Sequence, residues 1–239
     1  MLVIREYNRE HARAYAERWA FERNPLYYNY AGIGGNCTNF VSQCLYAGSC
    51  RMNYTPIYGW YYLSPAARTA AWTGVEYLYN FLTENKNVGP FAEEVGEEGV
   101  EIGDVVQLGR EEAGYYHSLL VVGRNEEGIL LAANSEDAYL RPLATYEYDY
   151  ARFLHILGVR LELPDTADCF LSLLEGVAIL PDLTSLPPIA PEEPPAEEET
   201  PPETPPLPEV PSLPETLPAL SRGVSPVLSK NDAPYRGPA

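Results

Sequence analysis

The residue best placed to do chemistry is Cys37, which follows a glycine-rich turn and begins a helix-forming stretch. Residues 34–45 read Gly-Gly-Asn-Cys-Thr-Asn-Phe-Val-Ser-Gln-Cys-Leu. The first turn of a helix has unpaired backbone N–H groups and the positive end of the helix dipole, so it stabilises a thiolate and can receive an oxyanion. A histidine within reach of Cys37 would complete an acyl-transfer site.

His117 is the histidine that we expect beside Cys37. It lies in a predicted strand, 116–122, and a sheet packed on the helix would bring the two side chains together across the 80 positions that separate them. Cys37 would then attack a carbonyl, and His117 would take up and return the proton. We interpret His11, on a helix face, and His155, within an apolar strand, as structural residues.

The elements that must position this pair follow from the periodicity of apolar residues. Helical spacing predicts helices, and short apolar runs between glycines and charges predict strands. The predicted helices span 5–21, 37–48 and 72–82, and the predicted strands span 104–108, 116–122, 128–133 and 153–159. Helices followed by hairpin-like strands are typical of an α+β domain with an antiparallel sheet.

Composition divides the chain into a folded part and a tail. Of its 239 residues, 16 are Lys or Arg and 34 are Asp or Glu, and the net charge of -18 argues against binding to nucleic acid. Of the 23 prolines, 18 follow residue 162. We therefore predict a domain over 1–162, a short apolar segment of uncertain structure over 163–182, and an acidic, proline-rich, disordered tail over 183–239 that suits a basic protein partner.

No segment predicts export or membrane insertion. Residues 1–10 include charged side chains from Arg5 onward and have no uninterrupted apolar core of the kind that a signal peptide has. The apolar run 169–180 is much shorter than the roughly 20 residues of a membrane span. The sequence as written therefore predicts a cytoplasmic protein. Action outside the cell or at the cell wall would need an export route that the sequence does not reveal.

The cysteines predict neither a disulfide framework nor a metal site. Cys37 and Cys44 are seven positions apart on one predicted helix, which is about 10 Å and too far to bridge, and Cys44 falls on the apolar face of that helix. Paired metal-ligand spacings such as Cys-x-x-Cys do not occur. We expect no metal and no cofactor.

Several blocks of sequence carry a resemblance to a known family. They are the run that contains Cys37, Gly59-Trp60-Tyr61-Tyr62, Ala71-Trp72-Thr73, Gly103-Asp104-Val105-Val106-Gln107 and Tyr116-His117-Ser118-Leu119-Leu120-Val121-Val122. In this order, over about residues 5–160, they resemble the bacterial putative amidase domain, which is related to the NlpC/P60 and CHAP-type cysteine peptidases of papain-like fold. The resemblance implies a Cys-His site that cleaves amide bonds, often in cell-wall peptides.

The resemblance also implies further site residues. A polar group that orients the histidine is expected on the next strand, where Asn134 stands in a position at which the family more often has histidine. Asp137 is the reserve candidate for this role. The family often has Asp before the nucleophile, where this chain has Asn36.

Other site residues are open between two interpretations. Tyr30 or Asn36 could supply a second donor for the oxyanion beside the N–H of Cys37. Trp60 and Trp72 could line a substrate groove, although packing in an aromatic core is the commoner explanation.

Two functions from different classes follow. The first is a cysteine amidase or peptidase that acts on peptides or peptidoglycan stem peptides. The alternative is a catalytically silent module of the same fold that binds peptides or glycopeptides. Selective alkylation of Cys37 at neutral pH favours the enzyme.

Overall fold

The structure is a computed structural model that describes residues 1–164 and 168–178. The predicted acidic tail, 183–239, and the partner expected for it lie outside the described residues. So do residues 165–167 and 179–182 of the short apolar segment. Within the described part, no helix is both long and apolar enough to cross a bilayer.

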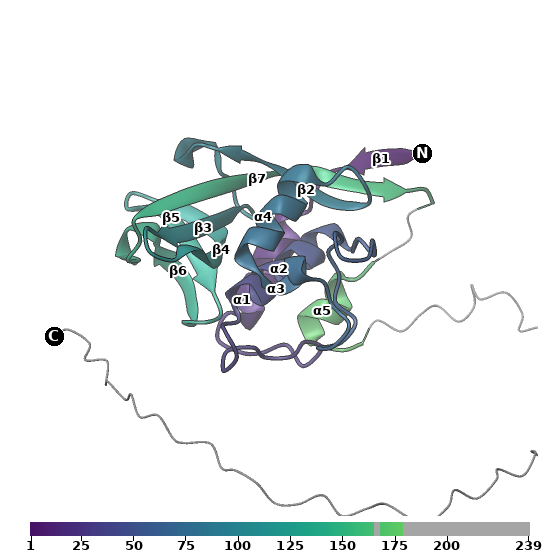
Figure 1. Ribbon diagram of the computed structural model, residues 1–239, viewed down its shortest axis with the longest axis horizontal. Helices are drawn as coiled ribbons and strands as arrows, with labels where there is room; N and C mark the ends of the chain where they lie inside the picture. Colours follow the sequence, from purple (N-terminus) through teal and green to yellow (C-terminus); the bar gives the residue numbers. More distant parts are fainter. Residues whose placement is uncertain (165–167, 179–239) are drawn as a thin grey trace, which may run out of the picture. The chain divides into compact units, whose positions relative to one another are not determined.

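The framework is one antiparallel sheet in which the strands follow the order β1-β7-β3-β4-β5-β6, with β2 also paired to β7 (Figure 1). The strands are β1 (Leu2–Arg5), β2 (Gly89–Val95), β3 (Val105–Arg110), β4 (Gly114–Asn125), β5 (Gly128–Ala133), β6 (Ala138–Pro142) and β7 (Tyr150–Glu162). The long strand β7 pairs with β1, β2 and β3, so it joins the N-terminal segment to the hairpins of the second half.

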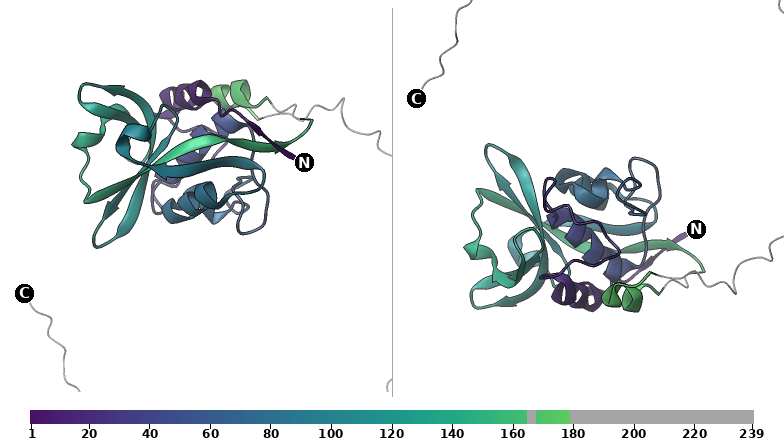
Figure 2. Two further views of the ribbon diagram at one scale, coloured as in Figure 1. Left: turned by 90° about the horizontal axis from the view of Figure 1, so that it is seen from above. Right: turned by 90° about the horizontal axis from the view of Figure 1, so that it is seen from below.

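The helices gather beside this sheet (Figures 1 and 2). They are α1 (Arg9–Trp19), α2 (Cys37–Ser49), α3 (Ala70–Thr73), α4 (Val75–Glu84) and α5 (Phe170–Glu175), with 3-10 turns at Glu97–Gly99 and Leu143–Thr145. Helix α2 is the most deeply placed, because all of its residues except Tyr46 are buried.

Strand β4 separates two hydrophobic clusters because its side chains alternate between the two faces of the sheet. Leu120 and Val122 pack into the cluster formed with the helices, whereas Leu119 and Val121 pack into a smaller cluster on the other face. The same alternation applies to His117 and Ser118 at the start of the buried stretch. Consecutive residues of β4 therefore face opposite sides of the sheet and contact different groups.

The predicted class, α+β with an antiparallel sheet, is confirmed. Three strands were missed: β1, β2 and β6. Each is short or irregular in pattern, since β1 has four residues, β2 begins with Gly-Pro and carries two adjacent glutamates, and β6 ends in proline. The predicted helix 72–82 is divided at Gly74, which is extended and caps α3 before α4 begins.

The absence of a disulfide framework was a wrong prediction, because Cys50 and Cys169 form a disulfide with their Cα atoms 5.5 Å apart. Spacing along one helix could not reveal it, since 119 positions separate the two residues. The bond joins the residue that precedes α5 to the residue that follows α2, and α5 lies beside α1 in both views of Figure 2. The carbonyl of Leu173 accepts hydrogen bonds from the Trp19 indole (3.1 Å) and the Asn24 amide (2.9 Å).

Candidate active site

A turn of unusual backbone geometry delivers Cys37 to the first position of α2. Gly34 and Gly35 have φ values of +95° and +104°, a region that glycine occupies without steric cost. The N–H of Asn36 then donates to the Ser135 hydroxyl (2.8 Å), which ties the turn to the β5–β6 connection. The sequence Gly-Gly-Asn-Cys therefore fixes where the helix begins and where the thiol lies.

The side chain of Asn36 organises the loop in front of Cys37. Its Oδ1 accepts from the Tyr30 N–H (3.1 Å) and from the Asn39 amide (2.9 Å), while its Nδ2 donates to Asn134 Oδ1 (2.6 Å). The amide is 2 % exposed. The structure places it inside the loop, where it connects three segments of chain.

Cys37 and His117 line the same cavity, which has a volume of about 490 Å³. Both are nearly covered, with exposed fractions of 8 % and 9 %. The other lining residues come from the glycine turn, from β3, β4 and β6, and from the connections that flank β6; they are Gly34, Gly35, Arg110, Tyr116, Ser135, Glu136, Arg141, Thr145, Tyr146 and Glu147. The start of α2 and the sheet thus meet at this cavity.

The electrostatics around Cys37 favour its thiolate. Burial raises the pKa of the thiol, but the hydrogen bond and charge of His117, a backbone hydrogen bond from Ser118 and the Thr38 hydroxyl outweigh it and bring the pKa to about 7. Cys44, two turns further along α2, has no such partners, and its burial raises its pKa well above the usual value. The two cysteines of α2 therefore differ in the direction in which their surroundings shift the thiol pKa.

Donors for an oxyanion are present at the same helix end. The first backbone bond of α2 runs from the Phe40 N–H to the Asn36 carbonyl (2.9 Å), and the Asn36 side chain makes no capping bond. The N–H groups of residues 37–39 therefore precede the helical hydrogen-bond ladder. These N–H groups lie at the end of α2 that begins with Cys37, which is the kind of donor set that an oxyanion needs.

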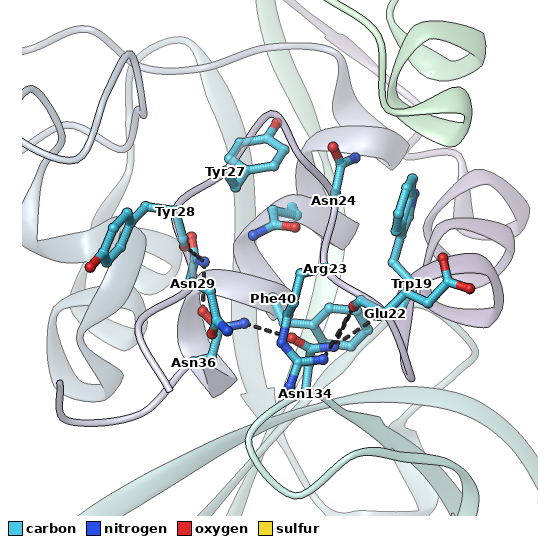
Figure 3. Close-up of a pocket in the computed structure, with 12 residues that line it drawn as sticks. Trp19, Glu22, Arg23, Asn24, Tyr27, Tyr28, Asn29, Asn36, Phe40 and Asn134 are labelled. Carbon is cyan, nitrogen blue, oxygen red and sulfur yellow. Dashed lines mark hydrogen bonds between the residues drawn. The ribbon is translucent and has the colours of Figure 1, made fainter. Parts of the chain in front are cut away.

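Asn134 does not reach His117 in the structure. Its Nδ2 donates to the carbonyls of Trp19 (2.8 Å), Ala20 (3.0 Å) and Glu22 (3.1 Å), which fastens the β5–β6 connection to the end of α1 (Figure 3). Its oxygen accepts from Asn36. The predicted orienting residue is thus a brace between α1 and the loop that carries Cys37.

The reserve candidate, Asp137, is also occupied elsewhere. Its carboxylate lies 2.7 Å from a guanidinium nitrogen of Arg23, beyond the end of α1. Among the described residues, the hydrogen-bonding and charge interactions of His117 act on the Cys37 thiol. The ring centroids of Tyr116 and Tyr146 lie 6.0 and 6.2 Å from that of His117. The described site thus brings a thiol, an imidazole and two phenol rings to one cavity.

The aromatic candidates lie in the core. Trp60 and Trp72 are fully buried and pack on each other at 4.8 Å between ring centroids. Their indole N–H groups donate to Ser42 (2.9 Å) and Asn39 (2.9 Å). Tyr30 is buried beneath the Arg68 guanidinium, 4.7 Å from its ring centroid. Of the two interpretations of these tryptophans, their complete burial favours packing in the aromatic core.

The sequence analysis missed the charged and phenolic residues that line the cavity. Arg141 donates to the Thr145 hydroxyl (3.0 Å) and carbonyl (2.9 Å), lies 3.4 Å from Glu136, and stacks over the Tyr146 ring at 3.8 Å. These residues come from β6, a strand that the pattern did not predict, and from the connections on both sides of it. Over the described ranges, no group of three or more His, Cys, Asp or Glu side chains is placed to hold a metal ion.

Comparisons with known proteins agree with this geometry at the level of a family. The chain is 30% identical over 139 residues to the uncharacterized protein YhbB of Bacillus subtilis (strain 168). That match covers 57% of this chain and 44% of the relative, so the chain spans less than half the length of that relative. No solved structure matches the chain. The model of the putative amidase domain matches residues 6–157, which include both Cys37 and His117, and the chain belongs to this family.

Proposed function

We propose that this protein is a cysteine hydrolase that cleaves amide bonds in peptides, with Cys37 as the nucleophile and His117 as the general acid and base. The observation that carries the proposal is the pairing of the two side chains in one cavity at the start of α2, with the Cys37 pKa lowered to about 7. Such a thiol is about half ionised at pH 7, which supplies the thiolate that a nucleophile needs.

The reaction would follow the acyl-transfer sequence. The Cys37 thiolate attacks the amide carbonyl, and the developing oxyanion faces the N–H groups at the start of α2. His117 gives its proton to the leaving nitrogen as the C–N bond breaks, which leaves a thioester on Cys37. His117 then takes a proton from water, whose oxygen attacks the thioester and releases the acid and the thiolate.

The polarity of the cavity supports a short, charged peptide as substrate. Arg110 and Arg141 supply positive charge and Glu136 and Glu147 supply negative charge around the dyad. An apolar chain would leave these groups desolvated without partners, whereas a peptide with free carboxylate and amino groups would pair with them. Peptidoglycan stem peptides belong to this class, and a papain-like ancestry for the domain accords with the same chemistry.

The disulfide supports action in a compartment where disulfides persist. Cys50–Cys169 bonds are stable outside the cytosol, whose thiol systems keep cysteines reduced. Cell-wall peptides are found in such surroundings. We infer that the protein works there, in place of the cytoplasm that the N-terminal sequence predicts.

The test is hydrolysis of purified peptidoglycan and of isolated stem peptides by the full chain, measured as newly released amino groups and identified by mass spectrometry. Cys37→Ala is expected to abolish release while the far-UV circular dichroism and melting temperature are preserved. Cys44→Ala is the matched control, because Cys44 lies on the same helix and in the core. Undiminished release by Cys37→Ala would refute the proposal, and saturable binding without release by the unmodified chain would identify the silent binding module.

A further inference from the structure

A buried line of hydrogen bonds runs along the helix-facing side of the sheet, from Arg152 on β7 to the Cys37 sulfur. Arg152 on β7 donates from Nε to Gln107 Oε1 (2.7 Å), and Gln107 Nε2 donates to the Ser118 hydroxyl (3.1 Å). The Ser118 and Thr38 hydroxyl oxygens are 3.0 Å apart, and Thr38 Oγ1 lies 3.8 Å from Cys37 Sγ. Gln107 and Ser118 are fully buried and Thr38 is 1 % exposed, so water does not interrupt the line.

The chemistry of the groups fixes the direction of the bonds that Gln107 makes. A guanidinium has no acceptor, so the oxygen of the Gln107 amide must face Arg152. The two N–H groups of that amide then go to the Val75 carbonyl (2.9 Å) and to Ser118. Since the Ser118 oxygen accepts from Gln107, its single O–H is available for Thr38. In that arrangement the O–H of Thr38 is available to Cys37, although the geometry of these last two contacts allows either atom to donate.

We propose that Arg152, Gln107 and Ser118 are positioning residues that polarise this line, so that Thr38 presents a hydroxyl donor to the Cys37 thiolate. A hydrogen bond that is made to the charged form of a group favours that form. The line therefore adds a second source of activation beside His117, from the opposite face of β4. This inference rests on the proposed function and deepens it by naming residues that prepare the nucleophile.

Arg152 is built into the protein as a permanent anchor. Its guanidinium is sandwiched between the rings of Tyr79 and Tyr115, each 3.7 Å from its central carbon, and one nitrogen lies 3.1 Å from Glu76. The side chain is 6 % exposed. A guanidinium has donors and no acceptor, so the direction of the bond from Arg152 to Gln107 is fixed.

The experiment measures the rate at which iodoacetamide alkylates Cys37 in the full chain from pH 5 to 9, with the modified residue located by mass spectrometry. Thr38→Val keeps the shape of the side chain but removes the donor, and it is expected to raise the Cys37 pKa by about one unit. The alkylation rate at pH 6 then falls about tenfold, because the thiolate fraction falls by that factor. Thr38→Ser keeps the hydroxyl and is expected to retain the profile of the unmodified chain.

Gln107→Glu tests the direction of the line. A carboxylate only accepts, so Ser118 must donate to residue 107 and Thr38 must donate to Ser118, which withdraws the donor from Cys37. The expected shift has the same sign as that of Thr38→Val. The new charge could also act on Cys37 through space, so the variant that combines Thr38→Val and Gln107→Glu is decisive. If the line transmits the effect, the Cys37 pKa of this double variant shifts as much as in Thr38→Val alone. If charge alone acts, the shift is the sum of the shifts in the two single variants.

The remaining titratable and charged groups that face Cys37 are unchanged in these variants, so the profile reports on the line itself. They are His117, Arg110, Tyr116, Glu136, Arg141, Tyr146 and Glu147. If Thr38→Val does not fold, Gln107→Glu is compared with Gln43→Glu, which buries a carboxylate on α2 outside the line, where Gln43 accepts from Tyr15 (2.7 Å). Equal shifts in these two variants would refute the inference.

The outcomes separate this inference from the proposed function. If the unmodified chain shows an ordinary thiol that is indifferent to His117→Ala, both are refuted. If Cys37 is activated and depends on His117, but Thr38→Val and Gln107→Glu leave its profile unmoved, the polarised line is refuted and the proposed function stands. A shift in both variants with retention in Thr38→Ser supports both.

Discussion

Two histidines of the sheet, His117 and His155, have polar partners but very different surroundings. The Nδ1 of His155 lies 2.7 Å from Asp104, a carboxylate that is fully buried. The same carboxylate accepts from Arg9 (2.6 Å) and from the backbone N–H groups of Ile156 (2.9 Å) and Glu101 (2.8 Å). This cluster ties the start of α1 to β7 and to the turn before β3.

The two clusters differ in how much hydrogen-bonding capacity and open space remain beside the histidine. In the His155 cluster, the hydrogen-bonding capacity of Asp104 is spent on the fold, and His155 is coupled to a carboxylate rather than to a nucleophile. At His117, the partner is a thiol and both groups open on a cavity of about 490 Å³. A histidine and a polar partner are therefore not sufficient for chemistry; a reactive partner and open space beside it are also required.

The largest expected effect separates the two histidines by activity. His117→Ala is expected to lower the rate of amide cleavage about 10³-fold, because general acid and base catalysis is lost. His155→Ala is expected to leave that rate within a few-fold of the original while lowering stability. The measurement is initial release of amino groups from purified peptidoglycan at equal enzyme concentration. A loss of equal size in both variants would break the comparison.

The second effect separates them by stability. Asp104→Ala leaves the Arg9 charge and the His155 ring without their buried partner and is expected to lower the free energy of unfolding by about 3–5 kcal/mol. The alkylation rate of Cys37 should not change. Glu101→Ala is the matched control, because Glu101 also pairs with Arg9 (3.1 Å) but is 63% exposed, so its loss should cost less than about 1 kcal/mol. Urea denaturation measures both, and equal losses would contradict the distinction.

Asn134 sharpens the comparison, since the sequence analysis placed it at His117. Asn134→Ala removes an amide that satisfies buried carbonyls at the end of α1, and it is expected to lower the free energy of unfolding by about 1–3 kcal/mol. The pH profile of Cys37 alkylation should stay in place. An unchanged unfolding free energy together with a displaced profile would return Asn134 to the role of orienting His117.

The smallest effect concerns pH. With a pKa of about 7, Cys37 should be alkylated about tenfold faster at pH 8 than at pH 6, since the thiolate is the reacting form. Cys44 should remain unlabelled over this range, because its pKa is raised. The lowered pKa also stabilises the folded state above the unfolded-state pKa of the thiol, and this contribution is lost as the pH falls through about 7. A Cys37 profile centred near pH 9 would contradict the dyad.

The elements that could be predicted from the sequence are those that a short run of neighbouring residues determines. The glycine turn, the start of α2 and the strand that carries His117 were predicted because each has a strong local signal, and β5 matches its predicted range. The partner of Asn134 could not be predicted, because it depends on how the end of α1 meets the β5–β6 connection. The same holds for Arg152 and Gln107, which become neighbours of the site only through the pairing of β3 with β7.

Among its described cysteines the protein has both a disulfide, Cys50–Cys169, and the free thiols of Cys37 and Cys44. A reductant in the solution acts on both kinds of sulfur. A reductant added to keep Cys37 as a free thiol also attacks the bond that fastens α5, although Cys169 is only 2 % exposed and is difficult to reach. Strong reductants therefore change the molecule that is being assayed. A mild thiol at low concentration maintains the nucleophile and leaves the covalent closure of the fold intact.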